Sequence, residues 1–193
     1  MTAPKLVLHP QACDAAPTYD AIVLALRDLG TIGTRFALDG NTHFQTGPDF
    51  LDGIGFLGCA PSIQLDPPAQ HAEPAARAGR FCHIQVQAPT ERPRLRCKSG
   101  QGPRCRRCRS DIPPDLIQAP DADIACPDCG HPASLAGLNW RQSGGYARVF
   151  LDIWGIHAGE AVPSDRLLDR LGHLARSDRS SGDGPWQFFY IED

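Results

Sequence analysis

The sequence has no apolar stretch long enough to cross a membrane, and it has few charged residues. No run approaches the roughly 18 to 20 apolar residues that a membrane span needs. The N-terminal residues also lack the charged region followed by an apolar region that marks a secretory signal. With 41% apolar and 21% charged residues among 193, the composition is typical of a globular domain. We therefore expect a cytoplasmic protein without a membrane partner, and nothing in the sequence indicates its oligomeric state.

Known catalytic motifs are also missing. The chain has no G-x-S-x-G, no Walker loop and no G-x-G-x-x-G. His157 and Glu160 lie between an expected strand and the start of an expected helix, where free N–H groups favour anions. Cys59 is a candidate nucleophile, but the sequence places no base beside it. We therefore expect a non-enzymatic protein, and the alternative is an enzyme of unknown reaction with its site near His157 and Glu160.

Acidic residues are missing from residues 92–109, a segment of 18 residues that carries eight positive charges. The rest of the chain holds 11 basic and 22 acidic residues, so the net charge of −3 conceals two parts of opposite sign. Such a separation can orient a molecule toward an anionic partner. The candidate contact residues are Arg92, Arg94, Arg96, Lys98, Arg104, Arg106, Arg107 and Arg109.

Periodic apolar residues predict an α+β fold. Ile22 and Leu26 recur at helical spacing after Thr18, a good N-cap residue, and Gly30 supplies the stop of this first helix. Strands are expected at 5–9, 34–38, 81–87, 146–154 and 186–191, and helices at 18–29 and 164–175. Two β-α-β units with antiparallel joining strands predict a ferredoxin-like antiparallel sheet with both helices on one face.

Four of the eight cysteines form two tight pairs. The pattern is Cys105-x2-Cys108, then 17 residues, then Cys126-x2-Cys129. A spacing of two residues lets one turn aim both sulfurs at a common point, and two such turns supply the tetrahedral corners that Zn²⁺ accepts. The four-cysteine set predicts one structural zinc ion per chain.

Two further residues near the pairs are alternative ligands. His131 lies two positions after Cys129, and Cys97 lies eight positions before Cys105. We expect neither to displace one of the four paired cysteines, because a closed structural zinc site needs four ligands and the pairs already supply them.

The segments CRRCRS and CPDCGH resemble the two knuckles of a zinc ribbon, and the second is similar to the knuckle of rubredoxins. The resemblance covers about residues 95–133 and implies a structural metal. Arg109 stands where a rubredoxin would have a glycine, so an iron electron-transfer site is less expected than zinc. No family is recognised for the rest of the chain.

These observations predict a single domain that carries an insertion. Residues 1–91 and 134–193 form the α+β domain, with an antiparallel sheet and two helices, and residues 92–133 form the inserted zinc ribbon. Residues 66–79, interrupted by three prolines, are expected as an exposed loop or linker.

The arginine run and a nearby aromatic strand suggest an anionic partner, either nucleic acid or an acidic protein. Arginine suits phosphate and carboxylate groups, and Tyr146, Phe150 and Trp154 on one strand face are placed to stack on bases. Aspartates in the same loop, such as Asp111, can instead neutralise the arginines locally. We predict a zinc-binding adaptor protein whose basic tip contacts the partner; the alternative is a protein–protein regulatory module without nucleic-acid contact.

Overall fold

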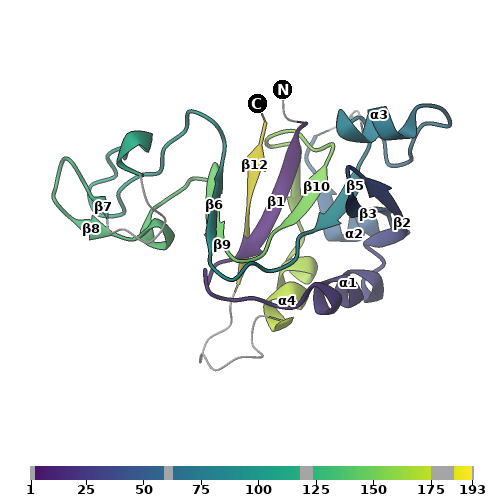
Figure 1. The fold of residues 1–193 in the computed structure, drawn as a ribbon, viewed down its shortest axis with the longest axis horizontal. Helices are drawn as coiled ribbons and strands as arrows, with labels where there is room; N and C mark the ends of the chain where they lie inside the picture. The colour runs from purple at the N-terminus through teal and green to yellow at the C-terminus, as the bar shows by residue number, and fades with distance from the viewer. Residues whose placement is uncertain (1–2, 59–62, 118–123, 175–184, 193) are drawn as a thin grey trace.

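The chain folds around one large antiparallel sheet. We analysed a computed structural model, which describes residues 3–58, 63–117, 124–174 and 185–192. Within these residues the sheet has six strands, each antiparallel to its neighbours (Figure 1). Its strands are β1 (Lys5–Pro10), β2 (Ile32–Leu38), β3 (Asn41–Thr46), β5 (His83–Val86), β10 (Leu151–Trp154) and β12 (Trp186–Ile191).

The order of these strands confirms the α+β class but not the ferredoxin-like topology. The order across the sheet is β12-β1-β10-β5-β3-β2. The strands on either side of the first helix, β1 and β2, have three other strands between them, so this β-α-β unit is not a compact half of a ferredoxin-like sheet. The described residues form four α-helices rather than two: α1 (Tyr19–Asp28), α2 (Phe50–Gly53), α3 (Ala72–Arg77) and α4 (Asp165–Leu174).

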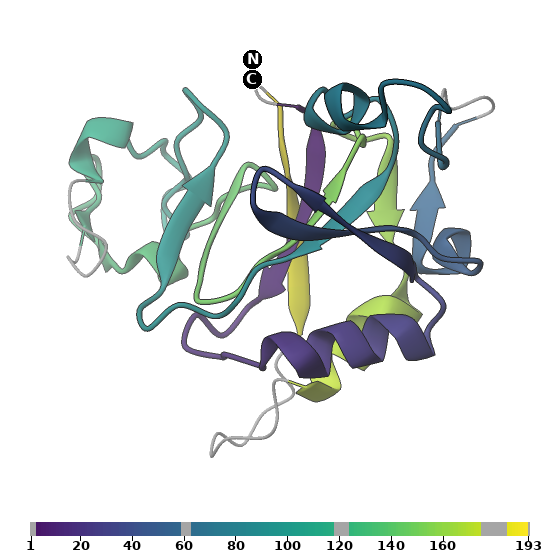
Figure 2. The same cartoon turned by 45° about the vertical axis from the view of Figure 1, so that its right-hand side comes forward.

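The two long helices, α1 and α4, lie side by side on one face of the sheet (Figures 1 and 2). Both begin where the sequence predicts: the Thr18 hydroxyl accepts from the N–H of Ala21 at 3.3 Å, and the Ser164 hydroxyl accepts from the N–H of Leu167 at 3.3 Å. Residue 175 lies outside the described residues. The principal residues of this core are Leu6, Leu8, Ile22, Leu26, Ile84, Leu151, Ile153, Leu167 and Leu171. Each such side chain contributes about 1.5–3 kcal/mol when it is buried.

The expected strand at 146–154 is two strands that belong to different sheets. Its first part, β9 (Gly144–Ala147), pairs with β6 (Arg94–Cys97), and its second part, β10, enters the main sheet. The chain changes sheets near Phe150, whose carbonyl accepts from the N–H of Gln87 at 3.0 Å. The switch lays β6 and β9 against the face of the sheet opposite the long helices.

The remaining short strands form two small ladders, and the 66–79 prediction needs correction. Strand β4 (Ile54–Phe56) pairs with β11 (Ala161–Pro163), and β7 (Ile124–Ala125) pairs with β8 (Pro132–Ala133). Residues 66–79 are not wholly an exposed loop, because they contain α3. Ala75 and Ala76 of this helix are buried against Phe81, since small side chains allow its close approach.

Candidate metal centre and its surroundings

The four paired cysteines lie in a projection between β6 and β9, residues 98–143, which we call the cysteine lobe (Figure 1, left). Its two cysteine turns share one pattern of backbone hydrogen bonds. The N–H of Arg109 donates to the carbonyl of Cys105 at 2.9 Å, and the N–H of Cys105 donates to that of Ser110 at 2.9 Å. The turn that begins at Cys126 repeats both bonds, at 2.9 and 3.0 Å. Both turns also place their fifth residue at φ +66°, which is Arg109 in the first and Gly130 in the second.

The turns bring the four sulfurs together. The Sγ atoms of Cys105 and Cys129 lie 3.8 Å apart, those of Cys108 and Cys126 lie 3.5 Å apart, and all four lie within 4.8 Å of one another. A tetrahedral ion with Zn–S bonds of about 2.3 Å requires sulfurs about 3.8 Å apart. The cluster can therefore hold a metal ion in a closed, four-coordinate site.

Two of the cysteines, Cys108 and Cys129, have pKa values shifted in opposite directions. Hydrogen bonding with the side chain and backbone of Ser110 lowers the pKa of Cys108 to about 6. A backbone hydrogen bond at His131 lowers the pKa of Cys129. Burial and hydrogen bonds with the neighbouring cysteines outweigh it and raise this pKa to about 12. The sulfurs thus compete for negative charge. A dication bound at the centre would remove this competition, because it would stabilise all four thiolates.

The two alternative ligands are not in the cluster. Among the described residues, the possible metal ligands that lie together at this site are the sulfurs of the four paired cysteines. His131 contributes its backbone carbonyl to the second turn, accepting from Cys126. Cys97 is exposed at the end of β6.

A small core supports the turns from below. Cys105 and Cys126, the first cysteine of each pair, are buried, whereas Cys108 is exposed. The Trp140 indole N–H donates to the carbonyl of Leu135 at 3.0 Å and closes the base of this core. The buried residues are Cys105, Ile112, Ile124, Cys126, Leu135, Leu138, Trp140 and Tyr146.

Two residues of the arginine run serve the fold instead of a partner. The Arg96 guanidinium makes a bidentate ion pair with Asp152 at 2.6 and 2.9 Å, and the Asp152 side chain is 1% exposed. Lys5 and Gln87 also contact this carboxylate, at 3.6 and 3.0 Å. The neighbouring Arg94 donates to Gln87. This buried cluster, which we call the Asp152 clamp, joins β6 to the main sheet, and the sequence pattern did not reveal it.

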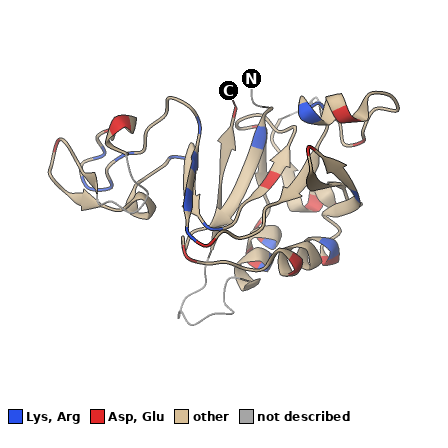
Figure 3. Cartoon of the chain, viewed as in Figure 1, with Lys and Arg blue, Asp and Glu red and all other residues tan. Residues whose placement is uncertain are grey.

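The other basic residues remain at the surface of the lobe or beside it (Figure 3). Arg92 is exposed before β6, and Lys98 is half-buried after it. Arg104 pairs with Asp111 at 2.9 Å, and Arg141, which lies outside the predicted run, reaches the same carboxylate at 3.3 Å. Exposed pairs of this kind contribute about 0–1 kcal/mol, so they leave the guanidinium groups available.

Four arginines line one open hollow next to the four-cysteine cluster. Arg104, Arg106, Arg109 and Arg141 surround a space of about 640 Å³ together with Cys105 and Asn139. Arg106, Arg107 and Arg109 are exposed, and none has an ion pair with a carboxylate of the described residues. Within the described part of the chain, the first cysteine turn thus presents cations to solvent that no carboxylate pairs.

The aromatic side chains that were expected to stack on bases are largely covered by other parts of the protein. Phe150 is 0% exposed and Tyr146 is 9% exposed. The Arg96 guanidinium covers the Phe150 ring at 4.9 Å, and the Lys5 ammonium lies 4.1 Å over the half-buried Trp154 ring. The expectation that these aromatic residues stack on bases is wrong, because Tyr146 packs in the small core of the cysteine lobe and residues of the Asp152 clamp lie over Phe150 and Trp154.

The candidate enzyme residues lie near the protein surface. His157 is exposed, and it contacts Glu192 through its ring and Glu160 through its backbone N–H, at 2.9 Å for the latter. Neither His157 nor Glu160 lines the cavities at the cysteine lobe, at α3 or beside α2 and α4. Cys59 lies outside the described residues.

Three buried histidines, His9, His43 and His83, form part of the sheet face that lies opposite the long helices, and the sequence did not show that they share this face. His43 Nδ1 lies 3.2 Å from His83 Nδ1, and His83 Nε2 lies 3.1 Å from the carbonyl of Ala76. Burial lowers the pKa of His9 and of His83 to about 4, so both rings are neutral near pH 7. The alternation of β5 placed His83 on this face, but no sequence signal showed that the face is covered.

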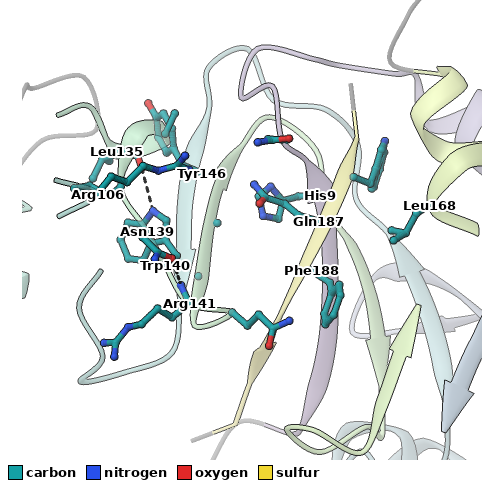
Figure 4. Close-up of a pocket in the computed structure, with 17 residues that line it drawn as sticks. His9, Arg106, Leu135, Asn139, Trp140, Arg141, Tyr146, Leu168, Gln187 and Phe188 are labelled. Atoms are coloured by element: carbon teal, nitrogen blue, oxygen red, sulfur yellow. Dashed lines mark hydrogen bonds between the residues drawn. The ribbon is translucent and has the colours of Figure 1, made fainter. Parts of the chain in front are cut away.

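A second cavity separates the cysteine lobe from the edge of the main sheet (Figure 4). This edge cleft has a volume of about 360 Å³. Trp140, Asn139 and Arg141 lie on its lobe side, while Gln187 and Phe188 of β12 lie on its sheet side. Arg106 also lies on the lobe side, so the cleft borders the arginine-lined hollow.

Comparisons with known proteins add no identification. No family model, curated protein or solved structure matches this chain. Among the described residues, no helix is long and apolar enough to span a bilayer. The functional argument therefore depends on the sulfur cluster and its basic surroundings.

Proposed function

We propose that the protein is a zinc-stabilised, non-enzymatic binding module whose cysteine lobe contacts an acidic segment of a protein partner. In this proposal residues 92–133 are a zinc-ribbon insertion into a domain formed by residues 1–91 and 134–193, and residues 134–143 of that domain complete the core of the cysteine lobe. One zinc ion per chain binds four thiolates and closes the site. A catalytic zinc keeps an open position and usually three protein ligands, which four converging cysteines do not leave.

The observation that carries the partner proposal is the arginine-lined hollow. Arg106 and Arg109 come from the first cysteine turn, and Arg141 comes from the turn that precedes β9. The metal fixes the turn, so the guanidinium groups are held near one another. The planar fork of arginine matches a carboxylate, and charge-assisted pairs of this kind are stronger than neutral hydrogen bonds.

The charge of the whole lobe favours a discrete acidic group over a long polyanion. Residues 98–143 contain six Lys and Arg and five Asp residues. A zinc centre with four thiolates carries a formal charge of −2, which leaves the loaded lobe close to neutral. Nucleic-acid binding depends on phosphate neutralisation over an extended surface, and the aromatic face for stacking is buried. An acidic protein segment is therefore the partner we propose.

Metal binding is tested directly on the purified protein. Elemental analysis should give about one zinc per chain. Cys126→Ser should lose most of it, and Cys97→Ser, which alters a cysteine outside the cluster, should keep it. Retention of full zinc by Cys126→Ser would contradict the four-cysteine site.

The partner class is tested with two labelled probes, a blocked acidic peptide of alternating Glu and Val and a single-stranded oligothymidylate. Arg106→Glu with Arg107→Glu should weaken peptide binding roughly 5–30-fold, since each exposed pair contributes about 0.5–1 kcal/mol. Arg35→Glu with Arg80→Glu makes the same charge change at exposed sites away from the lobe and should have little effect. Oligothymidylate binding with a log–log salt slope of about −3 to −4, without peptide binding, would instead assign a nucleic-acid partner.

A further inference from the structure

Strand β12 forms one outer edge of the six-stranded sheet. The direction of its backbone hydrogen bonds shows which of its N–H and C=O groups point away from the sheet. Gln11 donates its N–H to the carbonyl of Pro185 at 2.9 Å, which identifies that pair as hydrogen-bonded. In an antiparallel ladder such pairs alternate, so Gln187 and Phe189 bond to β1. The backbone groups of Trp186, Phe188 and Tyr190 therefore point away from the sheet.

One hydrogen bond supports this assignment independently. The N–H of Tyr190 donates outward, to the carbonyl of Gln142 in the cysteine lobe, at 3.2 Å. The lobe thus continues the ladder at one residue of β12. Toward Phe188 the lobe and the strand separate, and the edge cleft of about 360 Å³ lies between them. Among the described residues no strand pairs with β12 on this side.

We propose that the edge cleft binds an extended acidic peptide segment of a protein partner, which adds as a strand to β12 beside Phe188. This inference rests on the proposed function and specifies how the acidic partner is held. Strand addition uses backbone N–H and C=O groups for affinity, and side-chain contacts for selectivity. Phe188 offers both backbone groups on the outward side.

The lining of the cleft specifies the charge of the segment. Arg106 and Arg141 belong to its wall, and no Asp or Glu is among its described lining residues. Its other polar side chains are neutral or, for His9, held neutral by burial near pH 7. A peptide lying along β12 can therefore direct alternate carboxylates toward the two guanidinium groups.

The experiment uses the zinc-loaded full chain and nuclear magnetic resonance, which detects weak complexes. The probe is the blocked peptide of alternating Glu and Val, and a Lys–Val peptide is its charge control. We expect the acidic peptide to shift the amide signals of Phe188 and Gln142, and the Lys–Val peptide to bind at least tenfold more weakly.

Two N-methylated versions of the acidic peptide test strand addition without altering the protein. One is methylated on the odd amides and the other on the even amides. Because only alternate residues of an added strand bond to β12, one version should lose at least tenfold in affinity and the other should bind nearly as before. Equal binding of both versions would overturn the inference.

A variant of the chain tests the same contact. Phe188→Pro removes the outward N–H at an edge position where proline does not break the ladder to β1, and Phe188→Leu retains it. Peptide binding should fall at least tenfold in the first variant and persist in the second. Equal binding by both variants would count against the β12 contact.

Three other outcomes overturn the inference in different ways. Shifts confined to Arg106, Arg107 and Arg109 would leave the acidic-partner function standing and remove the strand addition. Binding of oligothymidylate alone would remove both. Shifts of Phe188 that depend on protein concentration without peptide would assign the edge to a second copy of the chain.

Discussion

The sheet and the cysteine lobe achieve order in different ways. Among the described residues, the main apolar cluster of the sheet and its helices has 21 buried members, whereas that of the lobe and β9 has eight, two of which are cysteines of the sulfur cluster. A core of eight side chains is too small to offset the conformational entropy of a segment of this length. From this comparison we expect metal coordination to supplement the small hydrophobic core of the lobe and to be dispensable for the sheet.

The largest expected effect separates the two regions. Removing zinc with a chelator, or by Cys126→Ser, removes a binding free energy of about 10–16 kcal/mol that contributes to folding of the lobe. Amide hydrogen exchange should show the lobe unprotected while β1 and β10 remain protected. Cys97→Ser serves as the control and should behave like the parent protein. Loss of protection throughout the sheet would contradict the comparison.

The next effect concerns the Asp152 clamp, which joins the two regions. Asp152→Ala leaves Arg96 and Lys5 near the sheet without their carboxylate, and should lower the free energy of unfolding by about 3–5 kcal/mol. Asp28→Ala removes an exposed partner of Arg170 and should cost no more than about 1 kcal/mol. Urea unfolding followed by far-ultraviolet circular dichroism measures both. Similar losses in the two variants would show that the clamp is no stronger than a surface pair.

A third effect is the response of the sheet to acid. Burial lowers the pKa of His83 to about 4, from 6.5 in the unfolded chain, so the unfolded state binds the proton more readily. The resulting stability is fully present above about pH 6.5 and is lost as the pH falls toward 4, by up to about 3 kcal/mol.

His83→Gln should therefore flatten the dependence of the unfolding midpoint on pH in this window. His173→Gln, at an exposed position of α4, should leave the dependence unchanged. Acid also releases zinc from thiolates, so unfolding is followed by a probe in the sheet, and each variant is compared with its parent at the same pH. Equal slopes in the His83 variant and its parent would exclude the buried imidazole as the cause.

The smallest effect compares the two cysteine turns with each other. Arg109 adopts φ +66°, a conformation that disfavours residues with a Cβ, and Gly130 occupies the equivalent position at the same φ. Arg109→Gly should stabilise the lobe by about 0.5–1 kcal/mol, and Gly130→Ala should destabilise it by about 1 kcal/mol. A Cβ at Gly130 meets no atom within 4 Å, so the change isolates the backbone cost. Zinc-competition titration measures both, and effects of the same sign would contradict the equivalence of the turns.

Local patterns predicted the parts of the fold that local physics controls. The caps at Thr18 and Ser164, both long helices and strand β12 lie where periodicity placed them. The split of 146–154 into two strands was not predictable, because the alternation continues from β9 into β10. The break follows only from tertiary pairing, because β9 pairs with β6 whereas β10 pairs with β1.

The candidate site shows the same division. The spacing of the cysteines predicted the cluster correctly. The charge of residues 92–109 did not indicate which of their cationic side chains form ion pairs within the fold. Arg96 and Arg106 are ten positions apart in one run of like charge, yet the first is held by Asp152 and the second faces solvent. Asp152 lies 56 residues beyond Arg96, so no local pattern connects them.

The sequence alone determined the four-cysteine cluster. A two-residue spacing places both sulfurs of a pair on one side of a tight turn, and this geometry does not depend on the surrounding structure. The sequence also determined the principal helices, because their caps and apolar faces are local. Tertiary structure alone decided the strand order, the burial of the aromatic face and the open edge of β12. These depend on which distant segments pair, and pairing reflects packing of the whole chain rather than the preference of any one segment.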